Sequence, residues 1–264
     1  MTSETFAKLL LASYLAIMIV ILWWRSGRCR GGRIVWFLAA LSHIYCGLMY
    51  RVRAGGVSLP ETGPGLVICN HQNPLDPMLI WDPYRPALRN GGPRPIGFLM
   101  LKKYYDVVWL RWMYDALHAI PVARDGNDTG PVRQALRQLK NGELVGIFPE
   151  SRFNPHPQCL MPGDTGAAWI ALRAQVPVYP VFIENLPYSD DMIRPFFTPG
   201  RIQVHYGEPI DLSAFAGRRK NAETLREVTD LLMRRLAELG GVDYSGSEPI
   251  ATSHGRGERS VNDP

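Results

Sequence analysis

Residues 66–77 read Leu-Val-Ile-Cys-Asn-His-Gln-Asn-Pro-Leu-Asp-Pro, an apolar run followed by a polar stretch with two prolines. The run has the length and β-branched character of a strand, and the prolines prevent regular structure directly after it. Asp76 followed by Pro77 is typical of a helix N-cap with proline in the first helical position. The pattern therefore predicts a tight turn between a strand and a helix, and this turn carries both His71 and Asp76.

His71 and Asp76 have the composition of a proton-transfer pair. A carboxylate can hold the N–H of one ring nitrogen while the other nitrogen accepts a proton. Of the six histidines, only His71 is followed by an aspartate five residues later. A structural histidine beside a helix cap would give the same pattern, so the pair alone is weak evidence. A second charged cluster at 148–152, Phe-Pro-Glu-Ser-Arg, and an apolar N-terminus favour the functional interpretation.

The composition is that of a globular domain with a basic surface. The 264 residues are 46% hydrophobic and 20% charged, with a net charge of +5 and a pI of about 9.1. This charge suits an anionic membrane or a phosphorylated substrate, and no zinc-finger, helix-turn-helix or RNA-binding pattern supports nucleic acid as a partner. The four cysteines form no Cys-x-x-Cys pair, which argues against a zinc site or disulfide framework and favours a reducing compartment.

Two apolar runs near the N-terminus indicate membrane attachment. Residues 9–24 carry no charge and would form a helix of about 24 Å, short of the ~30 Å hydrocarbon core unless it extends past Lys8. Residues 34–50 form the second run, and arginines separate the two where a signal peptide would need small residues. One spanning helix and a hairpin within one leaflet both fit. Either predicts a membrane anchor at residues 1–50, with the catalytic domain on the cytoplasmic side of the cell membrane.

Beyond this anchor, strand-like apolar runs alternate with helical periodicity. The runs lie at 66–69, 96–99, 120–123, 144–148, 178–183 and 202–206. Helices are expected from 131 to 141, over about 165–174, and along the apolar stripe from 225 to the glycines at 240–241. This alternation predicts an α/β fold with a mostly parallel central sheet flanked by helices. We expect the domain to occupy residues 51–241 and the polar residues 242–264 to form a disordered tail.

Four segments, in order, resemble the motifs of one known family. The first is His71, any four residues, then Asp76; the others are 120–124 (Ile-Pro-Val-Ala-Arg), 148–150 (Phe-Pro-Glu) and 176–181 (Val-Pro-Val-Tyr-Pro-Val). The family is that of the glycerolipid and lysophospholipid acyltransferases, the 1-acylglycerol-3-phosphate acyltransferases. The likeness covers about residues 45–212 and implies an acyltransferase domain behind a two-helix membrane anchor.

The resemblance also implies a reaction. A fatty acyl chain would move from acyl-CoA or acyl carrier protein to the free hydroxyl of lysophosphatidic acid in phospholipid biosynthesis. His71 would remove the hydroxyl proton as general base, and Asp76 would orient the imidazole and stabilise its protonated form. The hydroxyl attacks the thioester directly, so we expect no acyl-enzyme, metal or cofactor. The expected partners are membrane lipids, the lysophospholipid and the thioester donor.

Four further residues would bind the acceptor. Arg124 and Arg152 would pair with its phosphate, while Glu150 would contact the glycerol hydroxyl or fix an arginine. Lys102 matches a basic position in the family's second region. Each could instead belong to a surface ion pair or a solvated face. The usual third motif of the family is Phe-Pro-Glu-Gly-Thr-Arg. Here Ser151 replaces the glycine, and Arg152 comes one position earlier than the arginine of the motif. Because serine adopts positive φ less readily than glycine, we expect this turn to differ.

Other functions remain open at this point. A Ser-His-Asp hydrolase would need Gly-x-Ser-x-Gly around its nucleophile, and no serine here has that context. A non-catalytic lipid-binding membrane protein could retain the fold, although the intact His71 and Asp76 argue against it. The acceptor could also be another lysolipid or an amide-linked lyso-aminolipid.

Overall fold

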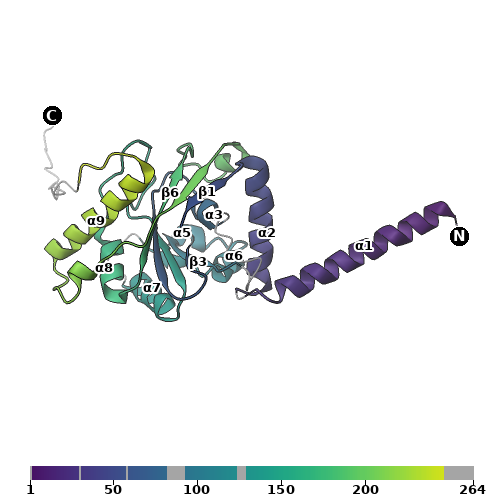
Figure 1. The fold of residues 1–264 in the computed structure, drawn as a ribbon, viewed down its shortest axis with the longest axis horizontal. Helices are drawn as coiled ribbons and strands as arrows, with labels where there is room; N and C mark the ends of the chain where they lie inside the picture. Colours follow the sequence, from purple (N-terminus) through teal and green to yellow (C-terminus); the bar gives the residue numbers. More distant parts are fainter. Residues whose placement is uncertain (1, 30, 58, 82–92, 124–128, 247–264) are drawn as a thin grey trace, which may run out of the picture.

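The computed structural model describes residues 2–29, 31–57, 59–81, 93–123 and 129–246. Within these residues the chain forms a seven-stranded sheet with helices against it (Figure 1). The strand order is β1-β7-β6-β2-β5-β3-β4. The strands are β1 Arg53–Gly56, β2 Gly65–Cys69, β3 Ile96–Leu101, β4 Ile120–Val122, β5 Leu144–Ile147, β6 Val178–Glu184 and β7 Gln203–Tyr206.

The predicted mostly parallel sheet is confirmed. β2 pairs in parallel with β5 and β6, and β3 pairs in parallel with β5 and β4. Only the edge departs from this direction: β7 is antiparallel to β6, and β1 runs parallel to β7. The strand β1 was not predicted, because its sequence Arg-Ala-Gly-Gly is exposed throughout and has no apolar pattern.

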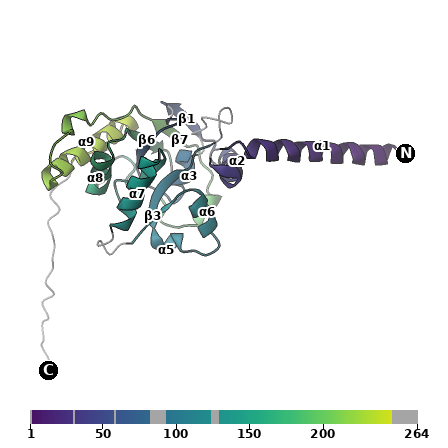
Figure 2. The same ribbon diagram turned by 90° about the horizontal axis from the view of Figure 1, so that it is seen from below.

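Helices pack on both faces of the sheet (Figure 2). Leu66 and Ile68 of β2 lie in a core shared with α7, α8 and α9, while Val67 and Cys69 lie in a core shared with α2 and α3. Burial on both sides explains why the run is apolar without alternation, and each fully buried Leu or Ile contributes about 1.5–3 kcal/mol. The helices are α1 Ser3–Ser26, α2 Gly32–Met49, α3 Asp76–Trp81, α5 Lys102–Tyr105, α6 Arg111–Ala116, α7 Gly130–Lys140, α8 Thr165–Ala174 and α9 Ala222–Gly240, with short 3₁₀ helices η1 Arg194–Phe197 and η2 Ser213–Phe215.

Capping residues fix the ends of the predicted helices. The Asp164 side chain accepts from the Gly166 N–H at the start of α8, and the Asn221 side chain accepts from the Thr224 N–H at the start of α9. Helix α9 ends at Gly241, which has a φ of 62°. The predicted helices over 131–141, 165–174 and up to Gly240 are thereby confirmed.

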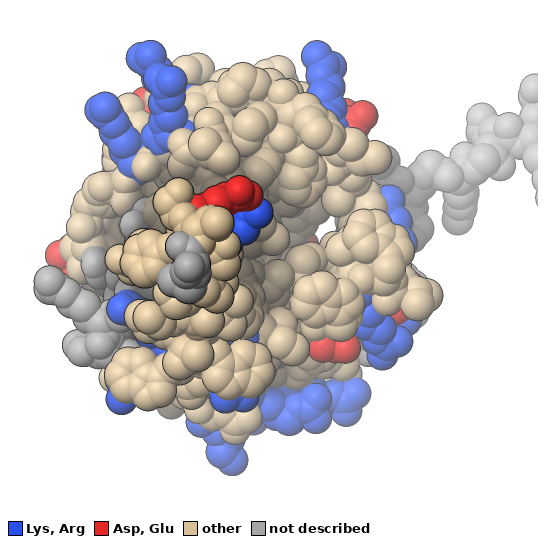
Figure 3. Space-filling view, turned by 90° about the vertical axis from the view of Figure 1, so that its right-hand side faces the viewer, with Lys and Arg blue, Asp and Glu red and all other residues tan. Residues whose placement is uncertain are grey.

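The two N-terminal helices meet the rest of the protein differently. Both are long and apolar enough to cross a membrane by length and composition, but α1 projects away from the domain and buries only Ser26 (Figure 1). Helix α2 packs against the sheet through Val35, Trp36 and Cys46. Its outward side carries a stripe of exposed apolar side chains at helical spacing: Ile34, Phe37, Leu41, Ile44 and Leu48. Figure 3 looks along α1 onto this side of the molecule, which is largely uncharged with Lys and Arg gathered mainly around its edge.

Order continues past the predicted end of the domain. The carbonyl of Asp243 accepts from the Leu160 N–H at 2.8 Å, and the Tyr244 hydroxyl donates to Asp230 at 2.8 Å. Residues 243 and 244 of the segment predicted as a disordered tail, 242–264, thus make defined contacts with the domain, and residues 247–264 lie outside the described part of the chain. A boundary between anchor and acyltransferase domain at residue 50 stays a prediction.

Candidate active site

The turn between β2 and α3 is organised by one carboxylate oxygen. Oδ2 of the buried Asp76 accepts from the backbone N–H groups of Gln72 and Asn73 at 2.8 and 3.0 Å, and it lies 2.8 Å from Nδ1 of His71. A carboxylate in this position accepts a hydrogen bond from Nδ1–H of a neutral imidazole, which leaves Nε2 as the proton acceptor. The structure thus brings His71 and Asp76 together as predicted.

The imidazole is held between aromatic rings. Its ring stacks on Phe148 with centroids 3.9 Å apart and planes 11° from parallel, and Phe153 lies 4.4 Å away at 58°. The His71 side chain is 17% exposed. Within the described part of the chain no residue forms a hydrogen bond with Nε2. The ring is therefore fixed in orientation while its basic nitrogen remains unpaired.

Contacts with the neighbouring strand β6 and the segment after it hold the turn in place. The side chain of buried Asn70 donates to the Ile183 carbonyl at 3.0 Å and accepts from the Ile183 N–H at 2.8 Å. The Asn73 side chain donates to the Pro187 carbonyl at 3.1 Å, which ties the turn to the segment after β6. Sequence reasoning did not single out Asn70, and its place directly before His71 was the available signal.

Glu150 supports the same turn from β5. One oxygen accepts from the His71 backbone N–H at 2.9 Å, and the other accepts from the Asn154 amide and the Met161 N–H at 2.7 and 2.8 Å. Its burial raises the pKa of the carboxyl above the ordinary value of 4.5, and these hydrogen bonds oppose the rise. The alternative of a surface ion pair is wrong for Glu150. Its hydrogen bonds position His71, and a direct contact with substrate stays a prediction.

The turn after Glu150 has the shape that glycine favours. Ser151 adopts a φ of 57°, and its N–H donates to the Phe148 carbonyl at 3.0 Å. Serine thus adopts the positive φ at some cost in strain, which the hydrogen bonds of Glu150 and of the turn outweigh, and the expected difference of this turn from the family's stays a prediction. Arg152 follows on the surface, and no hydrogen bond or ion pair joins its guanidinium to the described residues.

Two other predicted residues show no contact with this turn within the described part of the chain. Arg124 lies outside the described residues, and its position is not described. Lys102 begins α5, where its Nζ pairs with Asp106 at 2.9 Å and its side chain is largely exposed. Their roles in binding the acceptor stay predictions. Among the described residues there is no cluster of three or more His, Cys, Asp or Glu side chains that could hold a metal ion.

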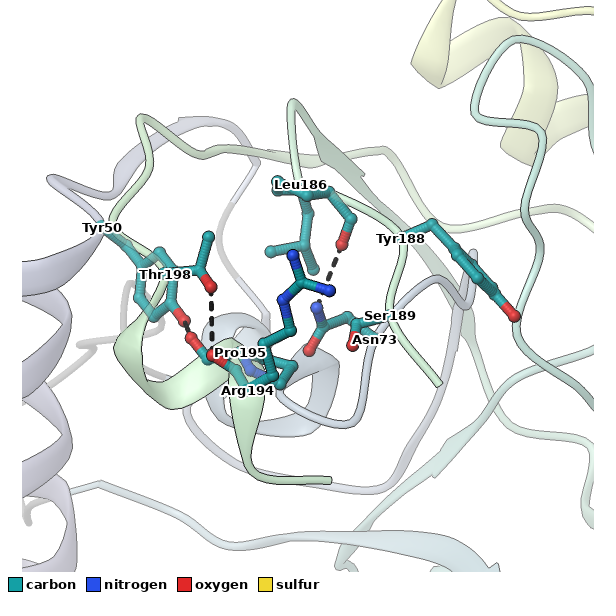
Figure 4. Close-up of a pocket in the computed structure, with 9 residues that line it drawn as sticks. Tyr50, Asn73, Leu186, Tyr188, Ser189, Arg194, Pro195 and Thr198 are labelled. Carbon is teal, nitrogen blue, oxygen red and sulfur yellow. Dashed lines mark hydrogen bonds between the residues drawn. The ribbon is translucent and has the colours of Figure 1, made fainter. Parts of the chain in front are cut away.

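A small pocket lies beside Asn73, between the turn after β2 and the segment after β6 (Figure 4). Its volume is about 150 Å³, and its walls include Leu186, Tyr188 and Arg194. The Thr198 hydroxyl and the Tyr50 hydroxyl donate to the carbonyls of Arg194 and Pro195, as Figure 4 shows. These two hydroxyls are thus engaged with the protein itself, and sequence reasoning did not identify Arg194.

The fold and the paired imidazole and carboxylate define the class of this protein. A family described as Acyltransferase matches residues 51–184, which is half of the chain, and the chain belongs to this family. The predicted family is thereby confirmed.

Particular relatives narrow the comparison. The chain is 25% identical over 182 residues to 1-acyl-sn-glycerol-3-phosphate acyltransferase from Bacillus subtilis, which covers 69% of this chain and 84% of that protein. It is 28% identical over 196 residues to human 1-acyl-sn-glycerol-3-phosphate acyltransferase beta, covering 69% of this chain and 66% of that one. The crystal structure of the 1-acyl-sn-glycerophosphate (LPA) acyltransferase PlsC from Thermotoga maritima has the same fold, with a TM-score of 0.61, 21% identity and coverage of 89% and 97%.

Proposed function

We propose that this protein transfers a fatty acyl chain from a thioester donor to the free hydroxyl of lysophosphatidic acid at a membrane surface. The observation that carries the proposal is the imidazole of His71, held by Asp76 with Nε2 unpaired. The names of the relatives from Bacillus subtilis and human support the choice of acceptor. Acyl-CoA and acyl carrier protein are both donors of the required chemistry.

In the proposed reaction Nε2 of His71 takes the proton of the acceptor hydroxyl as the oxygen attacks the thioester carbonyl carbon. The C–O bond forms, the carbonyl oxygen gains negative charge, and the tetrahedral intermediate then collapses with cleavage of the C–S bond. The imidazolium returns its proton to the departing thiolate, so the enzyme ends in its starting state. The Asp76 carboxylate stabilises the imidazolium during these steps and keeps its own charge.

The transition-state oxyanion requires donors from outside the turn itself. The N–H groups of Gln72 and Asn73 are engaged by Asp76, and the N–H of His71 is engaged by Glu150. Donors to the oxyanion must therefore come from elsewhere around the site. The exposed guanidinium of Arg152 and that of Arg124 remain our proposed partners of the acceptor phosphate, since arginine pairs with phosphate in a bidentate way.

Membrane attachment follows in this proposal from α1. None of its apolar stretch is buried, and aromatic side chains mark the end nearest the domain. Arg28 lies 3.4 Å from the ring centroid of Trp24, and Arg33 lies 4.2 Å from that of Trp23. Tryptophan beside arginine suits the headgroup region on the cytoplasmic side, where positive loops gather. The domain would then face lysophosphatidic acid in the same leaflet.

The test is acyl transfer by the purified full-length protein in lipid vesicles. Lysophosphatidic acid, lysophosphatidylcholine and a monoacylglycerol are supplied in turn with acyl-CoA or acyl carrier protein, and mass spectrometry identifies the products. We expect phosphatidic acid as the main product, and His71→Ala should lower kcat by about 10²–10⁴-fold because the general base is lost.

His205→Ala is the matched control, because His205 also pairs with a carboxylate, Glu184, at 2.9 Å, but on the antiparallel strands β7 and β6 rather than at the turn after β2. Its activity should match that of the wild type. Near-normal turnover of His71→Ala would overturn the mechanism, and no product from any of the three acceptors would overturn the proposed function.

A further inference from the structure

The segment between α5 and α6 exposes an unusual amount of apolar surface. Val108, Trp109 and Trp112 are 87%, 72% and 54% exposed. Single exposed apolar residues are common on protein surfaces. Several large apolar side chains exposed side by side instead mark a surface that contacts a membrane, another protein or a ligand. Neither tryptophan belongs to a hydrophobic core cluster of the described residues, and the Trp112 indole N–H donates to the Trp109 carbonyl at 2.8 Å.

Basic and aromatic residues surround this apolar tip. Lys103 lies 4.6 Å from the ring centroid of Tyr104, and the guanidinium of Arg111 lies 5.6 Å from that of Tyr105. Lys102 and Arg111 lie within 4.0 Å of Asp106 and Asp115, respectively, and with Lys103 the residues 102–115 keep a net charge of +1. Tryptophan and tyrosine prefer the boundary between hydrocarbon and headgroups, and lysine and arginine prefer anionic headgroups. The chemistry of the segment therefore fits an anionic bilayer.

The position of the segment fits the same occupant. Two perpendicular views place α6 beside α2, at the end of the domain from which α1 projects (Figures 1 and 2). The outward stripe of α2 runs along this end, and the exposed Ile193 and Phe197 of the segment around η1 lie near the C-terminal end of α2, to which they are linked by the hydrogen bond from Tyr45 to the Phe196 carbonyl. The end of the molecule seen in Figure 3 is thus continuous with the membrane helix.

We propose that residues 107–112, the α5–α6 tip, insert into the headgroup boundary of an anionic bilayer and hold the catalytic domain against the membrane at a second point. The proposal rests on the proposed membrane attachment by α1. It gives the domain a fixed orientation, because two separated contacts remove the freedom to pivot that one helix would leave. The lipid acceptor then reaches the site without leaving the surface.

The experiment measures what surrounds Val108 in the full-length protein. A polarity-sensitive fluorophore is attached to Val108→Cys in a Cys159→Ser background, because Cys159 is the partly exposed native cysteine and Cys29, Cys46 and Cys69 are buried. The protein is reconstituted into vesicles of phosphatidylcholine with one third phosphatidylglycerol. The matched control carries the label at Ala214→Cys in η2, which packs near α8 and α9 at the opposite end of the domain.

We expect lipids with brominated acyl chains to quench the label at 108, and aqueous iodide to quench it several-fold less than the label at 214. Lys103→Gln with Arg111→Gln should weaken this protection, whereas Arg219→Gln with Lys220→Gln, far from the tip, should leave it unchanged. Flotation with the vesicles reports attachment by α1 separately from the labels.

Equal iodide quenching at 108 and 214 in protein that floats would overturn the inserted tip while leaving the proposed function intact. Protection at 108 that needs no vesicles and grows with protein concentration would also overturn it, in favour of a second copy of the chain on this surface. Circular dichroism of each labelled variant verifies that it is folded.

Discussion

At the scale of single residues, the geometry of the site depends on the hydrogen bonds that one carboxylate accepts. Asp76 is buried, and a single oxygen serves two backbone N–H groups and the imidazole, while the other oxygen has no partner among the described residues. A buried charge is tolerated where such donors replace its hydration. Removing the charge therefore affects both the orientation of His71 and the stability of its protonated form.

Asp76→Asn should lower kcat by about 10²–10⁴-fold, because an amide cannot stabilise the imidazolium and can hold the ring in the wrong tautomer. The amide oxygen can still accept from the N–H groups of Gln72 and Asn73, so the variant should fold. Steady-state kinetics and the thermal midpoint, measured on the same preparation, check this. A variant that unfolds, or one that keeps wild-type kcat, would contradict the role given to the carboxylate.

Ser151 gives a prediction of opposite sign. A non-glycine residue in the left-handed region costs about 1–2 kcal/mol, and glycine loses about 0.5–1 kcal/mol through its freer unfolded chain. Ser151→Gly should therefore raise the free energy of unfolding by about 0.5–1 kcal/mol with kcat unchanged. Ser151→Val, with a β-branched side chain at the same φ, is the contrasting variant and should melt earlier. A lower midpoint for the glycine variant would show that the serine side chain itself stabilises the turn.

Glu150 should make stability depend on pH. Burial raises the pKa of this carboxyl, so the folded protein keeps the proton to a higher pH than the unfolded chain does. This contribution is fully present below the ordinary value of 4.5 and is lost as the pH rises through the folded pKa. Glu150→Gln removes this contribution and also places an amide N–H donor beside the His71 N–H. The thermal midpoint of the variant should therefore lie below that of the wild type. The difference between the two midpoints should narrow as the pH rises. Thermal midpoints of both proteins from about pH 4.5 to about pH 7.5 test this, and a gap that widens would reverse the sign of the shift.

Local patterns allowed His71 and Asp76 to be predicted, because both lie on one turn whose prolines and helix cap are visible in the sequence. The support for that turn could not be predicted in the same way. Asn70 is fastened to Ile183 and Glu150 to the His71 backbone, 113 and 79 residues apart in the chain. Such pairings depend on the order of strands in the sheet, and no local periodicity specifies that order.

At the scale of elements, burial decided what could be predicted. β2, β5 and β6 are apolar because helices cover both faces of the sheet, and runs of this kind are easily recognised. The exposed edge strand β1 was missed for the opposite reason. The two N-terminal helices looked alike in composition, and only the structure shows that α2 buries one side against the sheet while α1 buries none of its apolar stretch.

Helix α2 therefore has an inner and an outer side that neighbouring residues distinguish. Trp36 is buried against the core and Phe37 is exposed. Trp36→Ala should lower the free energy of unfolding by about 3–5 kcal/mol, because it leaves a cavity, whereas Phe37→Ala should cost less than about 1 kcal/mol. Thermal melts in the same detergent compare the two. Equal losses would mean that α2 is not packed on the domain as described.

At the scale of the whole molecule, the proposed membrane attachment combines a helix that leaves the domain with a surface of the domain. In this proposal α1 supplies apolar length without burial, the stripe of α2 and the α5–α6 tip supply surface contact, and the His71 turn follows a central strand of the sheet. Burial of an apolar helix and surface attraction respond differently to salt, since charge interactions weaken as the Debye length falls to about 3 Å at 1 M. The two kinds of attachment can therefore be separated by truncation.

Deleting residues 2–21 should leave the fold intact, because the buried Ser26 and the partly buried Leu22, which packs against the core, are retained. The truncated protein should keep a thermal midpoint near that of the full chain, but its binding to anionic vesicles should become sensitive to 1 M salt, where the full chain stays bound. Deleting residues 2–50 should instead remove Val35, Trp36 and Cys46 from the core and give aggregated protein. Flotation at low and high salt, with a thermal melt of each protein, makes the comparison. If the protein with the shorter deletion stays bound to vesicles in 1 M salt, the main membrane anchor is α2 and the domain rather than α1. If that protein is unfolded, α1 stabilises the domain in addition to attaching it.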